Sequence, residues 1–261
     1  MTALVTGASS GIGKEIALLL AERGYHLVLV ARREKELLDL VAQCDYGATV
    51  IAQDLGTPGA AGRLFDTVRQ KELEIEVLVN NAGFGRAQEH VGIDVATLES
   101  MNHLNITTLS SLCRLFGEEM KKRGHGSILN VGSTAAYLAI PQMANYAASK
   151  AFVASFTRAF RYEMAPYGVQ VSLLNPGATM TEFGVRAGDG FDFLKNKPGL
   201  MTAQDVARAG IEALFADVGE VVPGSLNKAM RIALRFAPTS IVTRLASVWA
   251  TRGRPGTGSG A

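Results

Sequence analysis

Long apolar runs and cysteines are both scarce in this sequence of 261 residues. No stretch approaches the roughly 18 unbroken apolar residues that a membrane-spanning helix needs. The first apolar run, residues 3–5, leads into a glycine turn and does not resemble a signal peptide. Cys44 and Cys113 are the only cysteines and lack the spacing of a disulfide framework, so we expect reduced, buried thiols. We therefore expect a cytoplasmic protein, and we expect no metal site.

A strong net charge is missing too, since 26 basic and 24 acidic residues leave only +2. This balance gives no basis for nucleic-acid binding, and 48% apolar residues supply enough material for a buried core. Acidic residues are absent after Glu220, where we count six basic ones: Lys228, Arg231, Arg235, Arg244, Arg252 and Arg254. We expect residues 223–252 to form a basic amphipathic extension and residues 253–261 a frayed tail. The extension fits docking on the core, a subunit contact, a lid over the active site, or weak membrane-surface association.

Short apolar runs rich in β-branched residues alternate with longer helical patterns. The expected strands are Thr2–Thr6, His26–Ala31, Ala48–Gln53, Glu76–Asn80, Ser127–Gly132, Val169–Leu174 and Glu220–Val222. The expected helices cover residues 11–23, 33–44, 60–72, 95–122, 145–165 and 203–216. Apolar strands separated by helices predict parallel strands with both faces covered. We therefore expect one α/β domain over residues 1–222, a Rossmann-type doubly wound sheet of about seven strands, with residues 178–202 as a substrate loop.

A glycine-rich turn joins the first expected strand to the first helix. It contains Thr6, Gly7, Ser9, Ser10, Gly11, Ile12 and Gly13. Backbone N–H groups at a helix N-terminus suit a pyrophosphate, and glycine lets that backbone approach the ligand closely. A purely structural turn is the alternative. A kinase-type phosphate loop is excluded because Ala8 and Glu15 occupy the positions of its first glycine and its magnesium-binding hydroxyl.

The end of the second strand bears on the choice of nucleotide. NAD enzymes usually place a carboxylate there for the ribose hydroxyls, whereas this chain has Ala31 followed by Arg32 and Arg33. A guanidinium binds a phosphate through two parallel hydrogen bonds, so we expect NADP(H). The alternative is that both arginines open a solvated helix.

Three residues form a candidate catalytic group. Ser133 follows the fifth strand, and Tyr146 and Lys150 are four residues apart on an expected helix. Because positions i and i+4 share a helix face, the phenol and the ammonium should enter one cleft. A nearby cation is expected to lower the tyrosine pKa toward the working pH, where the phenol both gives and takes a proton. Ser133 would hydrogen-bond the substrate oxygen.

These motifs together resemble the short-chain dehydrogenase/reductase family. The turn from Thr6 to Gly13, the run Asn80-Asn81-Ala82-Gly83, the Ser133, Tyr146 and Lys150 triad, and Asn175-Pro176-Gly177 all match that family. The resemblance implies that Asn105 holds a water for proton relay to Lys150, with Asn102 as a nearby competitor. It further implies cofactor contacts from Asp54, Leu55, Asn81, Ala82, Gly83, Lys150, Pro176, Gly177, Thr179 and Thr181. Ser10 stands where one NADP-preferring branch has a basic residue, so the choice of NADP(H) depends mainly on Arg32.

The resemblance also implies a hydride transfer between NADP(H) and a carbonyl or alcohol, in a homodimer or homotetramer. Specificity should lie in residues 84–92, 134–145 and 179–201, which supply the apolar side chains Leu138, Ile140, Met143, Phe183, Phe191, Phe193 and Leu200. An apolar pocket favours reduction of a lipophilic ketone, aldehyde or acyl compound. A non-catalytic NADP-binding regulator or scaffold is the alternative.

Overall fold

The computed structural model describes residues 1–182 and 199–251. A parallel sheet of seven strands runs through the part described, in the order β3-β2-β1-β4-β5-β6-β9. The strands are β1 (Thr2–Thr6), β2 (His26–Ala31), β3 (Ala48–Ala52), β4 (Val77–Asn80), β5 (Gly126–Val131), β6 (Val169–Leu174) and β9 (Glu220–Val221). The predicted doubly wound sheet is therefore confirmed, with strand ends within one or two residues of those expected.

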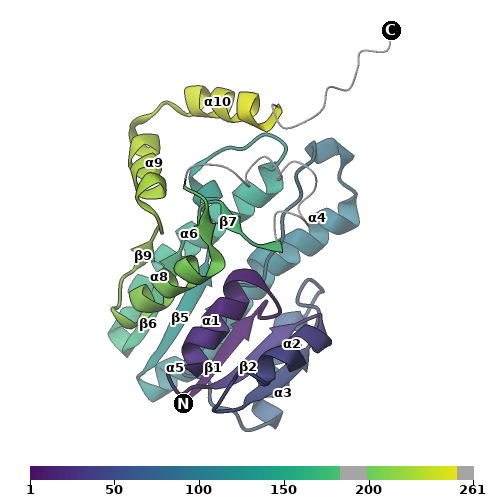
Figure 1. The fold of residues 1–261 in the computed structure, drawn as a ribbon, viewed down its shortest axis with the longest axis vertical. Coiled ribbons are helices and arrows are strands. Elements are labelled where there is room, and N and C mark those ends of the chain that lie inside the picture. The colour runs from purple at the N-terminus through teal and green to yellow at the C-terminus, as the bar shows by residue number, and fades with distance from the viewer. Residues whose placement is uncertain (183–198, 252–261) are drawn as a thin grey trace.

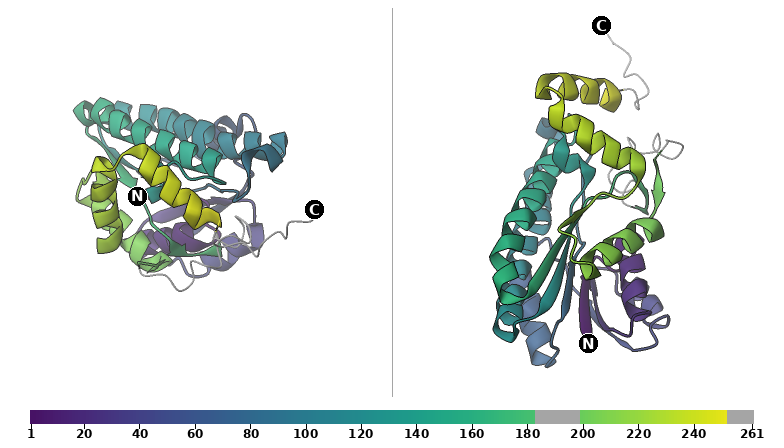
Figure 2. Two further views of the ribbon diagram at one scale, coloured as in Figure 1. Left: turned by 90° about the horizontal axis from the view of Figure 1, so that it is seen from above. Right: turned by 90° about the vertical axis from the view of Figure 1, so that its left-hand side faces the viewer.

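Helices cover both faces of the sheet (Figure 2). One face carries α1 (Gly11–Ala21), α2 (Glu34–Val41) and α8 (Ala203–Phe215), and the other carries α3 (Ala60–Gln70), α5 (Leu109–Arg123) and α6 (Ala144–Met164). Each face has its own apolar core, in which buried side chains of the strands meet those of the helices. Thr202 is the N-cap residue of helix α8, and its hydroxyl accepts the N–H of Asp205 at 3.1 Å.

The strand order places β1 and β4 side by side at the centre of the sheet. From β1 the chain continues to β2 and β3 on one side of β1, and then returns to β4 on its other side. The loops that follow β1 and β4 therefore lead away in opposite directions. Such a switch point leaves a crevice at the carboxyl ends of the strands. The glycine turn and the loops after β4, β5 and β6 all meet there.

Two local features differ from the sequence-based expectation. The helix expected over residues 95–122 is divided into α4 (Val95–Asn102), a π-helical turn η2 (His103–Thr108) and α5. This turn contains Asn105, which is fully buried, and π-turns often occur at functional sites. In the expected loop after β6, two short strands, β7 (Thr179–Met180) and β8 (Met201–Thr202), pair in parallel. These two strands were not expected, because two residues inside a loop carry no periodic signal of their own.

The C-terminal extension forms two helices, α9 (Ser225–Phe236) and α10 (Thr239–Thr251), on either side of Pro238. They lie at the end of the molecule opposite the N-terminus (Figure 1). The described residues also contain the short helical turns η1 (His90–Gly92), η3 (Thr134–Tyr137) and η4 (Ala165–Tyr167). Among the described residues, no helix is both long and apolar enough to cross a membrane. The expected tail, residues 253–261, lies outside the described residues.

Candidate active site

The glycine turn is held by hydrogen bonds from the loop after β4. The Thr6 hydroxyl accepts the backbone N–H groups of Asn81 and Ala82, each at 3.0 Å. The Asn81 amide donates to the carbonyls of Thr6 and Gly7 at 3.0 and 3.2 Å. The resemblance implied that Asn81 contacts the cofactor, but its side-chain amide nitrogen is used by the protein's own turn.

Helix α1 begins within this turn, just past the carboxyl end of β1. Ser10, at the N-cap position, makes no capping hydrogen bond with its side chain, although such bonds usually satisfy these N–H groups. A Cβ atom on Gly13 would clash with the Gly7 carbonyl and the Asn81 amide, so the turn closes only with glycine there. Uncapped amides at a helix N-terminus are the donor set that a pyrophosphate requires, and the turn therefore fits a dinucleotide. Ile12 packs partly buried against the core below the turn.

The two arginines after β2 have different surroundings. Arg32 is 67% exposed and forms a long ion pair with Asp54, at 3.8 Å. Arg33 donates to the hydroxyl of Ser9 at 3.1 Å and pairs with Glu182 at 3.2 Å. Arg32 thus presents a solvent-exposed guanidinium beside the turn, whereas Arg33 is engaged with the turn itself. The neighbouring Asp54 carboxylate also accepts the backbone N–H of Gly56 at 2.9 Å, and Leu55 is buried.

Ser133 and Tyr146 meet at the carboxyl end of β5. Ser133 begins η3, and its hydroxyl oxygen accepts the N–H of Ala135 at 3.1 Å. A hydrogen bond joins the Ser133 hydroxyl to the Tyr146 phenol. The Ser133 hydroxyl has one proton and two lone pairs, so it can accept the Ala135 N–H and still donate to the phenol oxygen, and a donated hydrogen bond acts to lower the phenol pKa. Two members of the candidate catalytic group, Ser133 and Tyr146, therefore converge in the structure.

Burial sets the ionisation of Tyr146 and Lys150. It raises the pKa of Tyr146 to about 12, although the Ser133 hydrogen bond acts in the lowering direction. This direction is opposite to the one expected from the sequence. Burial is the dominant cause, and it is not offset by the Lys150 ammonium, which donates to the Val131 carbonyl at 2.9 Å and lies 5.9 Å from the centre of the Tyr146 ring. Burial also lowers the pKa of Lys150, to about 8.

Asn105 lies on the other side of Lys150. Its side chain exchanges hydrogen bonds with the backbone of Phe84 at 3.0 and 3.2 Å and donates to the Ser149 hydroxyl at 3.0 Å. A Cβ atom on Gly83 would lie 3.1 Å from the Asn105 oxygen and 3.5 Å from the Lys150 nitrogen. Glycine therefore keeps the path between these two groups open. The competitor Asn102 instead accepts a hydrogen bond from Asn145 in an exposed position.

The loop after β6 closes the site from a third side. The Pro176 carbonyl accepts the N–H of Thr134 at 2.8 Å, which ties this loop to the serine loop. Thr179 donates to the Gly177 carbonyl at 3.0 Å. A Cβ atom on Gly11 would lie 3.1 Å from a Thr181 methyl group, so Thr181 stands beside the glycine turn. This loop therefore reaches from the Ser133 loop to the glycine turn.

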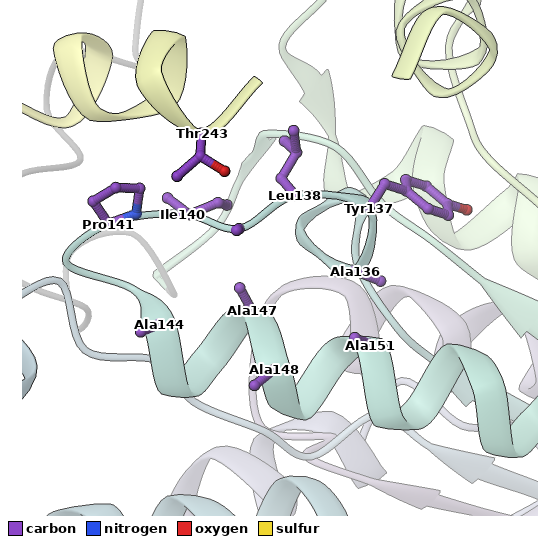
Figure 3. Close-up of a pocket in the computed structure, with 11 residues that line it drawn as sticks. Ala136, Tyr137, Leu138, Ile140, Pro141, Ala144, Ala147, Ala148, Ala151 and Thr243 are labelled. Atoms are coloured by element: carbon purple, nitrogen blue, oxygen red, sulfur yellow. The ribbon is translucent and has the colours of Figure 1, made fainter. Parts of the chain in front are cut away.

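Tyr146 belongs to a small buried apolar cluster with Met101 and Ala135. Phe84, Ile140 and Met143 pack against this cluster. A separate cavity of about 470 Å³ lies between α6, the loop after η3 and Thr243 of α10 (Figure 3). Leu138 and Ile140 line this cavity, whereas Ser133 and Tyr146, both within the described chain, lie outside its lining. Three predicted pocket residues, Phe183, Phe191 and Phe193, fall outside the described residues.

The polar residues that hold Ser133 from behind were not predicted from the sequence. The Ser133 N–H donates to the side-chain oxygen of Asn175 at 3.0 Å, and the Asn175 amide donates to Tyr137 and Glu220. Asn175 was noted only as part of a motif. The one signal for Glu220 was its position as the last acidic residue before the basic C-terminal segment.

Comparisons with known proteins agree with this geometry. A family model described as short chain dehydrogenase matches residues 1–190. The 7beta-hydroxysteroid dehydrogenase of Clostridium sardiniense is 34% identical over 223 residues, 81% of this chain and 81% of that protein. The NAD-dependent glycerol dehydrogenase of Listeria innocua serovar 6a is 31% identical over 186 residues, 71% of this chain and 73% of that protein. The structure of a short-chain dehydrogenase from Sphingobium yanoikuyae in complex with NADPH has a TM-score of 0.80 at 29% identity and covers 91% of this chain and 96% of that one.

The chain belongs to the short-chain dehydrogenase/reductase family. It is an oxidoreductase with a Rossmann-type nucleotide-binding fold, and its substrates are small molecules. The relatives include an NAD-dependent enzyme and a protein in complex with NADPH, so family membership leaves the choice between NAD and NADP open.

Proposed function

We propose that this protein is an NADPH-dependent reductase of lipophilic carbonyl compounds. The observation that carries the proposal is the hydrogen bond between Ser133 and the buried Tyr146 phenol, with Lys150 on the same helix. Ser133, Tyr146, Lys150 and Asn105 are its proposed catalytic residues. The uncapped start of α1 would hold the pyrophosphate, and Arg32 would bind the ribose 2′-phosphate.

Each proposed catalytic side chain has a distinct task. When bound, NADPH supplies the hydride that reduces the carbonyl carbon. Tyr146 donates its proton to the carbonyl oxygen, while the Ser133 hydroxyl hydrogen-bonds that oxygen as negative charge develops on it. The Lys150 ammonium stabilises the phenolate that remains, and Asn105 orders the proton path that returns a proton to Tyr146. A neutral phenol at pH 7, which the raised pKa ensures, is the form that reduction needs.

The substrate class follows from the surroundings of the phenol. Phe84, Ile140 and Met143 form an apolar wall around Tyr146, which favours a substrate with a hydrocarbon skeleton beside its carbonyl group. The relative named as a 7beta-hydroxysteroid dehydrogenase supports a substrate of this kind. We therefore place steroid ketones and long-chain 3-oxoacyl thioesters ahead of sugar ketoses.

The experiment is NADPH oxidation with a carbonyl panel: a 7-oxosteroid, a 3-oxoacyl thioester, an aryl ketone and a ketose. Tyr146→Phe should lower kcat on the reduced compound by a hundredfold or more, about the contribution of a general acid. Tyr162→Phe is the matched control, because Tyr162 lies on the same helix but is 81% exposed. Equal turnover by wild type and Tyr146→Phe would remove the proposed role of the phenol. Tight NADPH binding without turnover of any carbonyl would favour the regulator or scaffold.

We also propose that α9 contacts an anionic membrane surface. Leu226, Ile232 and Phe236 on this helix are 53%, 62% and 81% exposed. The basic residues Lys228 and Arg235 are exposed on the same helix. An apolar face beside basic residues in a segment without acids is typical of helices that lie in the headgroup region of a bilayer.

A further inference from the structure

A buried polar network lies directly behind the Ser133 loop. Asn175, which directly follows strand β6 and has no exposed surface, accepts the Ser133 N–H at 3.0 Å. The same side chain donates from its amide nitrogen to the Tyr137 hydroxyl at 2.7 Å and to a Glu220 carboxylate oxygen at 3.0 Å. The backbone of Ser133 is thus connected through one amide group to a carboxylate on strand β9.

Two arginines hold the Glu220 carboxylate in place. Arg158 of α6 donates to both of its oxygens, each at 3.0 Å, and Arg231 of α9 donates to one at 3.1 Å. Tyr137 donates its hydroxyl to the same carboxylate at 2.5 Å. The Glu220 side chain is only 12% exposed. Burial acts to raise the pKa of Glu220, but the hydrogen bonds from Arg158 and Tyr137 hold it below its usual range, so the group is ionised at neutral pH.

An ionised carboxylate accepts hydrogen bonds and donates none. Asn175 must therefore turn its NH₂ group toward Glu220 and its carbonyl oxygen toward the Ser133 N–H. If the amide were reversed, two donors would face each other at Ser133 and two acceptors at Glu220. A buried N–H without an acceptor costs about 1–3 kcal/mol, so the carboxylate selects one orientation of the amide.

We propose that Glu220 is a positioning residue for the catalytic serine: its carboxylate orients Asn175, and Asn175 holds the Ser133 loop where the hydroxyl meets Tyr146. This inference rests on the proposed function for the role of Ser133. Because Arg231 belongs to α9, the first helix of the C-terminal extension is also joined to the serine loop through Glu220. The geometry explains why the last acidic residue of the chain stands at the edge strand of the sheet.

The test compares Glu220→Gln with Asp217→Asn. Asp217 is the matched control, because it also pairs with an α6 arginine, Arg161, at 2.7 Å, and lies three residues before Glu220. A glutamine amide has a donor and an acceptor, so it no longer selects the Asn175 orientation. Hydrogen–deuterium exchange of a peptide containing Ser133 should be faster by about tenfold in Glu220→Gln, the effect of losing one hydrogen bond. It should be unchanged in Asp217→Asn.

Turnover provides the second readout, with the panel carbonyl that the wild type reduces. Glu220→Gln should lower kcat by about ten- to a hundredfold, because a small displacement of a catalytic group costs this much, while KM and NADPH affinity stay near wild type. In a Ser133→Ala background the same substitution should lower kcat no further, since the two residues act through one group. Tyr137→Phe, which keeps both ion pairs, is the second variant and should change exchange and kcat in the same direction.

The inference would be overturned if the Ser133 peptide exchanged as slowly in Glu220→Gln as in the Asp217→Asn control, whatever the turnover. The inference would also be overturned if Glu220→Gln lowered kcat by the same factor in the Ser133→Ala background as in the wild type, because Glu220 would then act elsewhere. If the wild type reduces no carbonyl, the proposed function fails, and the exchange comparison alone still decides whether Glu220 positions Ser133.

Discussion

Tyr146 and Lys150 are 8% and 5% exposed, and burial shifts their pKa values in opposite directions. Low polarity disfavours both charged forms, so the phenol keeps its proton and the ammonium loses its own more readily. At neutral pH the phenol is a proton donor, while a lysine pKa of about 8 leaves most of the ammonium charged. The residues therefore start from the protonation states that carbonyl reduction requires.

Arg32 should decide the choice between NADPH and NADH. Arg32→Ala should weaken NADPH binding by about tenfold, or about 1.4 kcal/mol, because an exposed guanidinium–phosphate contact is lost. NADH has no 2′-phosphate, so its affinity should stay unchanged. Arg114→Ala is the control, since Arg114 is 72% exposed and ion-paired like Arg32. Fluorescence titration of both nucleotides measures the effect, and an equal loss for NADPH and NADH would show that Arg32 does not bind the 2′-phosphate.

The candidate site residues that the sequence predicted either have partners close to them in the chain or lie directly after a strand. Tyr146 and Lys150 share a helix face, and Ser133 follows the strand before that helix. The pairing of Glu220 with Asn175 depends on β9 lying next to β6, which local patterns do not specify. The pKa of Tyr146 was predicted in the wrong direction because sequence spacing gives no measure of burial.

Among the elements, α9 differs most from an ordinary surface helix. Its inward side is anchored by Asn227, which is buried and donates to the Pro223 carbonyl at 2.8 Å, and by Arg231. Its outward side exposes apolar residues that the anchored helix cannot turn inward. The strands of the main sheet and most helices of its two faces were predicted from apolar runs and periods, whereas the π-turn at Asn105 arises from tertiary hydrogen bonds with Phe84 and Ser149.

The membrane proposal predicts that the protein sediments with vesicles containing phosphatidylserine and not with phosphatidylcholine alone. Phe236→Ser should reduce binding, whereas Tyr162→Ser, which alters an equally exposed aromatic on α6, should not. Arg235→Ala should cost about 1 kcal/mol, or about fivefold, because one charge near the anionic surface is lost. Equal sedimentation of the Phe236 and Tyr162 variants would exclude α9 as the contact.

At the scale of the whole molecule, the parallel sheet brings the proposed cofactor and substrate residues to one edge. The glycine turn follows β1, Ser133 follows β5, and the loop with Thr181 follows β6, so residues far apart in the chain meet at the carboxyl ends of these strands. This convergence follows from the strand order, which the alternation of strands and helices predicted in outline. The route of the C-terminal extension over this edge was not predictable, because its packing depends on Arg231 and Glu220.

The central claim is that the chain transfers a hydride from NADPH to a carbonyl with Tyr146 as the proton donor. It is tested most directly by a single turnover with NADPH deuterated at the transferable C4 position, followed by mass spectrometry of the product alcohol. We expect the wild type to give an alcohol that carries the deuterium on its new C–H carbon, and Tyr146→Phe to give almost none in the same time. The account would be contradicted if the wild type bound NADPH but transferred deuterium to none of the carbonyl compounds. It would also be contradicted if the wild type and Tyr146→Phe labelled the alcohol equally.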